Sequence, residues 1–229
     1  MKHRSLALAA GLAGWLALNA SFAIAAGSGP WQNLFDGKTL NGWIQKGGKA
    51  KYSVEDGVIV GSTVLNTPNS FLCTEKNYSD FILELEFKVD PRINSGVQIR
   101  SECFDQPKTV LDGAKEIKIP AGRVHGYQVE IDPSDRAWTA GIYDEGRRAW
   151  LNDLKNNEAA RKAFKQGEWN KVRVEAKRDS IKTWLNGVPA ADLQDGMTRT
   201  GFIALQVHGS KVENIQVRWR NIRLQTLGR

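Results

Sequence analysis

The chain has 229 residues and a formal net charge of +7, from 32 Lys and Arg against 25 Asp and Glu. These positive residues are scattered rather than clustered, which argues against a nucleic-acid-binding protein. The length suffices for one β-sandwich-sized domain with its own core, so we expect a single domain.

The N-terminus is typical of a secretory signal peptide. Basic residues 2–4 precede an apolar run over residues 6–18, and small residues follow around Ala23 and Ala25. We predict a signal peptide over residues 1–26, cleaved after about residue 23 to 26, and a mature domain over residues 27–229. Its removal leaves 30 basic and 25 acidic residues, a net charge of +5. The apolar run is too short to span a membrane, so we expect a periplasmic or secreted protein without a membrane partner.

Alternating apolar and polar residues, with a period of two, predict β-strands along most of the chain. The clearest strand covers residues 81–89, and the others follow at residues 97–102, 126–132, 172–176, 181–185, 203–208 and 217–224. A change of parity predicts a bulge near Arg220 and Asn221. Helical periodicity is confined to a turn or two within residues 151–164. The pattern predicts an all-β, antiparallel β-sandwich or jelly roll with few short helical turns.

The two cysteines leave a choice open. Export would place Cys73 and Cys103 in an oxidising compartment where a disulfide can persist. Two separate buried thiols are equally compatible with the sequence, because bridging depends on a Cα separation that the sequence does not give.

Three predicted strands carry unusual polar residues opposite apolar ones. They are Gln98, Arg100 and Glu102; Gln128, Glu130 and Asp132; and Gln206 and His208. Such side chains are directional donors and acceptors suited to sugar hydroxyls. If the strands are neighbours, they form a groove with a catalytic set of groups. Glu130 and Asp132 would lie about 7 Å apart on one face, near the spacing of acid and base in glycosidases, although such a pair is commonly only a solvated edge.

The sequence indicates less strongly whether the histidines belong to the site and whether the site binds a metal. His208 follows Gln206 on one face and precedes a loop, so a site role and a structural role are both open; His125 is expected in a loop or at the rim. Glu130, Asp132 and His208 are a minor candidate set for a divalent metal, because the sequence has no HxH or HxxxH spacing.

Loops supply further candidates. Asn94 begins a predicted turn, and the glycine-bounded segment 141–148, with Tyr143, is predicted to be a mobile loop at the rim of the site. Five tryptophans are candidates for stacking on sugar rings, although core positions are favoured for most of them: Trp31, Trp43, Trp138, Trp150 and Trp184.

The ordered motifs resemble the 3-keto-disaccharide hydrolase domain family along nearly the whole mature chain. They are WQNLFDGKTLNGW (31–43), NSGVQIR (94–100), GYQVEID (126–132), GIY (141–143), GEWN (167–170), WLNG (184–187), LQVH (205–208) and RNI (220–222). Positions 128 and 130 hold Gln and Glu where many members have Glu and Gln, which leaves open which position supplies the carboxylate.

The resemblance implies a concanavalin-like jelly roll and cleavage of glycosides whose C3 hydroxyl has been oxidised to a ketone. The ketone acidifies the C2 hydrogen, so a base can remove it and the C1 bond breaks by elimination before water adds. We expect His208 or Glu130 as base, the other as acid, and Arg100, or a metal, as oxyanion stabiliser, with Asp132 in the catalytic set. The expected substrate-binding residues are Asn94, Gln98, Gln128, Trp138, Tyr143 and Gln206.

Two other functions remain open at this point. The same fold serves non-catalytic carbohydrate-binding modules, which rely on aromatic platforms more than on charged pairs. Direct hydrolysis of unoxidised β-glucan by a carboxylate pair is the second alternative.

Overall fold

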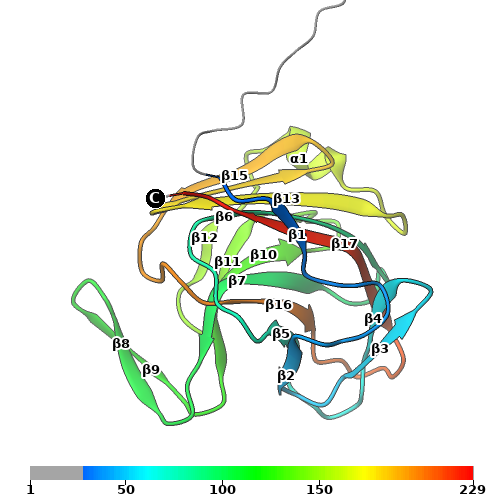
Figure 1. The fold of residues 1–229 in the computed structure, drawn as a ribbon, viewed down its shortest axis with the longest axis horizontal. Coiled ribbons are helices and arrows are strands. Elements are labelled where there is room, and N and C mark those ends of the chain that lie inside the picture. Colours follow the sequence, from blue (N-terminus) through cyan, green and yellow to red (C-terminus); the bar gives the residue numbers. More distant parts are fainter. Residues whose placement is uncertain (1–27, 229) are drawn as a thin grey trace, which may run out of the picture.

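The computed structural model describes residues 28–228, which form two antiparallel sheets packed face to face (Figure 1). The predicted signal peptide lies outside these residues. No helix in the described part of the chain is long and apolar enough to cross a membrane.

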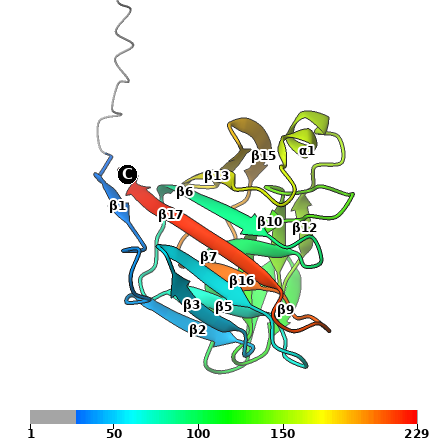
Figure 2. The same cartoon turned by 90° about the vertical axis from the view of Figure 1, so that its right-hand side faces the viewer.

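The first sheet has eight strands. Across the sheet the order is β15 (Val188–Gln194), β14 (Ser180–Leu185), β13 (Asn170–Lys177), β6 (Phe81–Val89), β17 (Gln216–Thr226), β4 (Val58–Ser62) and β3 (Lys51–Glu55), with β1 (Trp31–Asn33) paired to β17. In Figure 1, β15, β13, β6, β17 and β1 form the upper layer, and β4 and β3 lie at the lower right. Figure 2 shows the long β17 running beside β1, so the two ends of the described chain lie close together.

The second sheet has seven strands and carries the candidate site. Its order is β12 (Ala149–Asn152), β11 (Ile142–Glu145), β10 (Val124–Ile131), β7 (Ser95–Cys103), β16 (Phe202–Val207), β5 (Ser70–Thr74) and β2 (Trp43–Gly47). A separate hairpin of β8 (Lys108–Asp112) and β9 (Lys115–Ile119) projects from the body at the lower left of Figure 1.

The core lies between the sheets and follows the predicted alternation. Phe81, Leu83 and Phe87 of β6 are fully buried, and so are Val97 of β7 and Val129 of β10 on the facing sheet. Each such side chain contributes roughly 1.5 to 3 kcal/mol of stabilisation on leaving water. The apolar parity of each strand therefore fixes which residues face outward, and the predicted antiparallel β-sandwich is confirmed.

Smaller predictions have mixed outcomes. The bulge near Arg220 and Asn221 is confirmed by a register shift in β17, and a short helix, α1 (Glu158–Ala163), lies within the predicted helical segment. The segment 141–148 is not a mobile loop. It forms β11 and a tight turn, because Asp144 is buried and holds the turn through ion pairs with Arg147 and Arg148.

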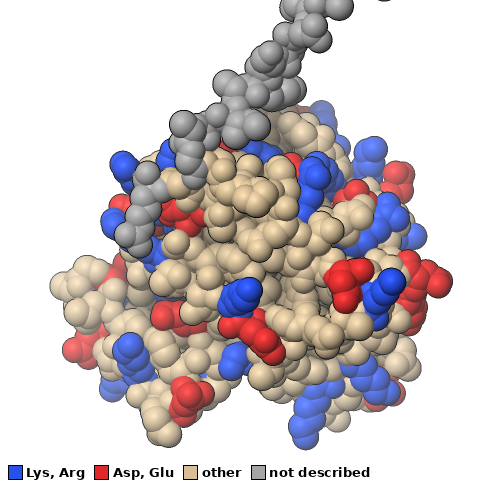
Figure 3. Space-filling model, in the orientation of Figure 1, with Lys and Arg blue, Asp and Glu red and all other residues tan. Residues whose placement is uncertain are grey.

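The charged residues and the two cysteines are distributed as follows in the structure. On the face drawn in Figure 3 the basic and acidic residues are interspersed, without a continuous basic patch. Cys73 and Cys103 are free thiols in this structure rather than a disulfide; Cys73 is buried in a small apolar cluster on the seven-stranded sheet, and the half-buried Cys103 packs against that cluster.

Candidate active site

A polar pocket of about 250 Å³ lies on the outer face of the seven-stranded sheet. Six of its lining residues are among the predicted site residues: Asn94, Gln128, Glu130, Tyr143, Gln206 and His208. Of the other three, Trp150 was one of the five candidate tryptophans, and Arg136 and Glu145 were not predicted as site residues. The sequence pattern therefore located the face of the sheet but only part of the pocket.

Strand register brings these residues together. Gln98 of β7 pairs with Gln128 of β10, which pairs with Tyr143 of β11, which in turn pairs with Trp150 of β12. Residues that pair directly across antiparallel strands share one face, so the row forms a continuous polar and aromatic strip. Gly96 is required beneath it, because a Cβ there would approach Cδ of Gln128 to 2.5 Å.

A network of buried amides ends at Glu130. Gln98 Nε2 and Gln206 Nε2 donate to Oε1 of Gln128 at 2.6 and 2.9 Å. Gln128 Nε2 then donates to Oε2 of Glu130 at 2.6 Å, and Asn94 Nδ2 donates to its Oε1 at 3.2 Å. Gln98 does not line the pocket; its contribution is to orient Gln128. The network fixes the position of the Glu130 carboxyl without giving it a cationic hydrogen-bond partner.

Burial raises the pKa of Glu130 to about 8. The hydrogen bond from Gln128 opposes this shift and the nearby Asp132 charge adds to it; the charge of Arg136 lowers the pKa slightly, and that of Glu145 raises it slightly. Removal of a carboxylate from water without a cation favours its neutral form. Glu130 is therefore mostly protonated at neutral pH and has a proton to donate, as a general acid requires.

His208, just after β16, and Glu145, at the end of β11, also line the pocket. His208 Nδ1 lies 2.8 Å from the carbonyl oxygen of Gly209, which only accepts hydrogen bonds. Nδ1 therefore carries the proton in neutral His208, and Nε2 keeps its lone pair. Burial raises the pKa of Glu145, whereas Arg123, which donates to its Oε1 at 2.7 Å, and the charge of His208 lower it.

Arg136 brings a positive charge to the pocket. Its Nε donates to Oδ2 of Asp132 at 2.7 Å, and its guanidinium lies over the rings of Trp138 and Trp150, with centroids 4.6 and 5.1 Å away. Trp138 packs edge-on against Trp150 at 4.8 Å and does not line the pocket itself. The ring that lines the pocket is therefore that of Trp150, which Trp138 supports from behind the pocket wall.

Two acceptors in the pocket wall lack partners. Oδ1 of Asn94 and Oε1 of Gln206 are buried and accept no hydrogen bond within the described residues. A buried polar atom without a partner costs about 1 to 3 kcal/mol, so a ligand that donates hydrogen bonds to these atoms recovers that free energy. Sugar hydroxyls are suitable donors.

The placement predicted for Arg100 is wrong. A register shift in β7 beside Gln98, with Arg100 at φ +46°, turns its side chain off the face shared with Gln98. The fully buried guanidinium instead donates to the carbonyls of Ser79 and Arg178 and to Asp80, at 2.6, 2.7 and 3.0 Å. Arg100 joins loops of the sandwich and is outside the pocket, and Glu102 lies beyond the same bulge.

The predicted pairing of Glu130 with Asp132 is also wrong, because Asp132 lies just past the end of β10 and turns into the loop that follows. Its carboxylate accepts hydrogen bonds from Ser134, Arg136 and the backbone N–H of Trp138, which together lower its pKa although burial alone would raise it. Asp132 acts on the pocket by holding Arg136. The second carboxylate of the pocket is Glu145.

The residues present do not fit the metal considered from the sequence. No three His, Cys, Asp or Glu side chains are grouped closely enough to hold an ion anywhere in the described chain. The oxygens of Asp132 are already occupied by donors, which separates it from Glu130 and His208 as a ligand set. His125 is fully buried on β10 against Phe104, with ring centroids 4.7 Å apart, and does not reach the pocket.

The three remaining lining residues differ in how far the sequence pointed to a place in the pocket. Trp150 was among the five candidate tryptophans, and Glu145 lies two residues after Tyr143 in the segment predicted as a rim. Arg136 gave no signal, since a loop folded around Asp132 brings it to the pocket.

Solved structures with the same β-sandwich fold resemble the chain over most of its length. A candidate glycosyl hydrolase from Parabacteroides distasonis matches with a TM-score of 0.56 at 22% identity, over 86% of this chain and 94% of its own. The carbohydrate-binding module CBM66 from Bacillus subtilis matches with a TM-score of 0.53 at 15% identity, over 80% of this chain and 94% of its own. At these identities the likeness concerns the fold, a concanavalin-like jelly roll.

Sequence comparison identifies the family. The chain belongs to the family of 3-keto-alpha-glucoside-1,2-lyase-like domains, whose model matches residues 30–225. It is similar to a 3-keto-disaccharide hydrolase from Bacteroides thetaiotaomicron, at 27% identity over 85% of this chain and 77% of the relative. The family resemblance read from the motifs is confirmed, and the chain is a carbohydrate-active hydrolase or binding domain.

Proposed function

We propose that this protein cleaves glycosides that carry a ketone at C3, by removing the C2 proton and eliminating the group at C1. The family and the name of the B. thetaiotaomicron relative support this proposal. The observation that carries it is the protonated Glu130 in one pocket with His208, whose Nε2 holds a lone pair.

His208 is the base in this proposal. Its Nε2 takes the C2 proton, which the neighbouring ketone has acidified, and an enediolate forms across C2 and C3. The fixed tautomer supports this role, because the hydrogen bond from Nδ1 to Gly209 keeps the lone pair of Nε2 available.

Glu130 is the acid. As the enediolate collapses to a C1–C2 double bond, the bond from C1 to the glycosidic oxygen breaks, and that oxygen takes the Glu130 proton. A carboxyl with a pKa near the working pH is well matched to such a transfer. This assignment chooses between the two alternatives that the sequence left open.

Arg136 takes the place first assigned to Arg100. It is the pocket-lining arginine, and its position is fixed by Asp132 and two tryptophan rings. A preorganised cation stabilises the developing oxyanion without the cost of reorganisation during the reaction. The unpartnered oxygens of Asn94 and Gln206 would accept hydrogen bonds from sugar hydroxyls. Addition of water to the C1–C2 double bond then completes hydrolysis.

Two observations keep other functions in the test. The unpartnered acceptors and Trp150 would equally serve a module that binds sugar without cleaving it. Glu130 and Glu145 are two carboxylates in one pocket, as direct hydrolysis of an unoxidised glycan requires.

The test is incubation of the purified mature protein in D2O with 3-keto-glucosides and with their unoxidised parents, with and without a chelator. We expect cleavage of the keto forms alone, deuterium at C2 of the released sugar, and no effect of the chelator. Cleavage of the parents without deuterium would support direct hydrolysis. Saturable binding of sugars with no cleavage would support a binding module.

We also propose that the enzyme works in the periplasm or outside the cell, since residues 1–26 read as a signal peptide. Expression of the full chain, followed by fractionation and N-terminal sequencing, tests this. A mature N-terminus near residue 24 to 27 in an exported fraction is expected, and a cytoplasmic product that retains Met1 would contradict it.

A further inference from the structure

A second hollow, of about 290 Å³, lies on the outer face of the same sheet. Its apolar lining residues come from the β2–β5 and β9–β10 regions: Pro68, Phe71, Pro120, Ala121 and Val124. Phe71 and Val124 are buried in a packed cluster and give the hollow a firm floor, whereas Pro68, Pro120 and Ala121 are exposed at its sides.

Three contacts join this hollow to the Glu130 pocket. Phe71 pairs directly with Gln206 across β5 and β16, so the two side chains are neighbours on one face. Asn69, which also lines the hollow, accepts a hydrogen bond from the N–H of Gly209, next to His208, at 2.9 Å. Arg123 lines the hollow and donates to Glu145 of the pocket at 2.7 Å. A molecule that fills the pocket therefore has its next group beside the hollow.

The hollow suits an apolar group better than a sugar. Five of its lining residues are apolar, and its two polar side chains, Arg123 and Asn69, each already make one hydrogen bond, with Glu145 and Gly209. A second sugar placed there would turn most of its hydroxyls towards apolar side chains, at about 1 to 3 kcal/mol for each hydroxyl buried without a partner. An aromatic ring has no such cost, and a cavity of about 150 Å³ already suffices for benzene.

We propose that this hollow binds the leaving group of the substrate and that the enzyme prefers 3-keto-glucosides with an aryl aglycone over 3-keto-disaccharides. The inference rests on the proposed function, because it assigns the group that departs from C1. In that step the C2 proton goes to His208, the C1–O bond breaks, and the oxygen leaves with the Glu130 proton as a phenol. The sugar part keeps its place in the polar pocket.

The experiment compares two substrates, phenyl 3-keto-glucoside and a 3-keto-diglucoside, on the wild-type enzyme and on Ala121→Glu. Ala121 is exposed, so the substitution places a carboxylate at the hollow with little effect on folding. Ala159→Glu, at an exposed position of α1, is the matched control. The measured quantity is the ratio of kcat/KM between variant and wild type for each substrate, so that the intrinsic reactivity of the two leaving groups cancels.

We expect Ala121→Glu to lower kcat/KM for the phenyl substrate by about tenfold or more, as loss of roughly half the burial of a ring predicts. The disaccharide value should change less than threefold, and Ala159→Glu should affect neither. Equal losses on both substrates, or no loss on the phenyl substrate, would overturn the aryl subsite while leaving the proposed function intact. Absence of cleavage of both keto substrates by the wild-type enzyme would overturn the proposed function, and this assignment with it.

Discussion

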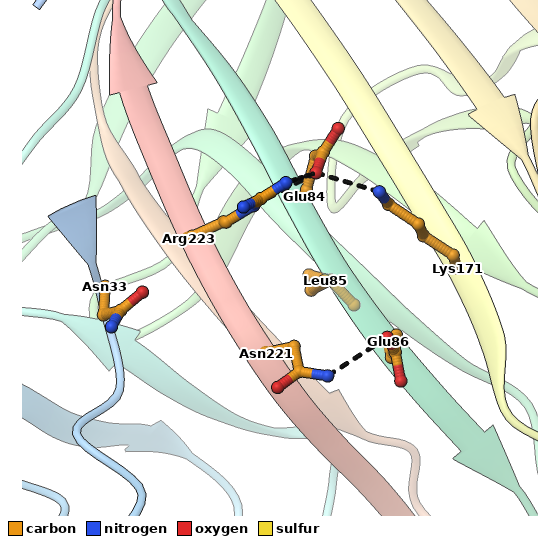
Figure 4. Close-up of a pocket in the computed structure, with 7 residues that line it drawn as sticks. All are labelled: Asn33, Glu84, Leu85, Glu86, Lys171, Asn221 and Arg223. Atoms are coloured by element: carbon orange, nitrogen blue, oxygen red, sulfur yellow. Dashed lines mark hydrogen bonds and ion pairs between the residues drawn. The ribbon is translucent and has the colours of Figure 1, made fainter. Parts of the chain in front are cut away.

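The outer faces of the two sheets both hold carboxylates in a hollow but place them in opposite electrostatic environments. On the eight-stranded sheet, Glu84 of β6 lies in a hollow of about 330 Å³ and contacts Arg223 and Lys171 at 2.6 and 2.9 Å (Figure 4). Glu84 also contacts Arg173 at 3.0 Å. Partial burial alone would raise the pKa of Glu84, but these cations hold it at about 2.

On the seven-stranded sheet, Glu130 receives hydrogen bonds from amides, and its pKa lies at about 8. The first hollow is larger and more heavily charged, yet each charge in it is neutralised by a neighbour. The second holds a proton that can be transferred and two acceptors without partners. A carboxyl group with a raised pKa and buried acceptors without partners therefore identify a candidate reactive site better than the size of a hollow or its number of charges.

The largest expected effect is on turnover. Glu130→Gln removes the transferable proton and should lower kcat on a 3-keto-glucoside by at least a hundredfold, about 2.7 kcal/mol in the barrier. Glu84→Gln makes the same chemical change on the other sheet and should alter kcat less than twofold. The measurement is steady-state release of the leaving group at neutral pH.

Circular dichroism of both variants controls for folding. A loss below about tenfold for Glu130→Gln would remove Glu130 from the mechanism. An equal loss of kcat for Glu84→Gln would show that the carboxyl groups on the two faces do not differ in their effect on turnover.

The second effect is on the pH dependence of stability. Unfolded Glu130 ionises near 4.5 and folded Glu130 near 8, so between these values the unfolded state loses its proton first. The wild type should therefore lose stability relative to Glu130→Gln as pH rises from about 4.5 to 8, with a slope of at most about 1.4 kcal/mol per pH unit. Urea unfolding followed by tryptophan fluorescence measures the difference, and a constant difference across this range would contradict the raised pKa.

The part of this site that could be predicted is the part that obeys strand parity. Val129 and Ile131 face the core, so Gln128 and Glu130 face outward, and the same argument places Gln206 and His208. Apolar alternation is a property of the sequence itself, which is why the sandwich, the face and these four lining residues follow from it; Asn94 and Tyr143 were expected from the family resemblance instead.

The rest depends on breaks in regular structure. The bulge in β7 leaves Val97 and Ile99 buried, so the apolar pattern shows no sign of the turn that removes Arg100 from the face. Arg136 reaches the pocket through a loop whose path is set by hydrogen bonds to Asp132. Both outcomes depend on contacts between residues whose positions the strand periodicity does not determine.

The third, smaller effect is also on the pH dependence of stability, but here the carboxyl group stabilises the protein more as pH rises rather than less. Glu84 ionises near 2 when folded and near 4.5 when unfolded, so its ion pairs stabilise the protein above about pH 4.5, and this contribution is lost as pH falls towards 2. Glu84→Gln should cost about 1 to 2 kcal/mol at pH 7, because its cationic partners are one-third to one-half exposed and regain water. The same urea titrations, extended to acidic pH, should show the two unfolding curves converging. A difference that grows towards acid would contradict the assigned ion pairs.

The smallest effect is expected at Glu86, beside Glu84 on the same face. Its carboxylate accepts hydrogen bonds from Arg220 Nε at 2.7 Å and Asn221 Nδ2 at 3.1 Å, and about a quarter of the side chain is exposed. Glu86→Gln should cost less than about 1 kcal/mol, since exposed pairs are screened and Arg220 still lies over the ring of Trp169, 4.0 Å from its centroid. Thermal unfolding at low and high salt measures this, and the difference should shrink at high salt. A loss above about 2 kcal/mol that persists in salt would mean that one ion pair on this face contributes much more to stability than an exposed pair normally does. The outer faces of the two sheets would then differ only in whether their carboxyl groups are ionised.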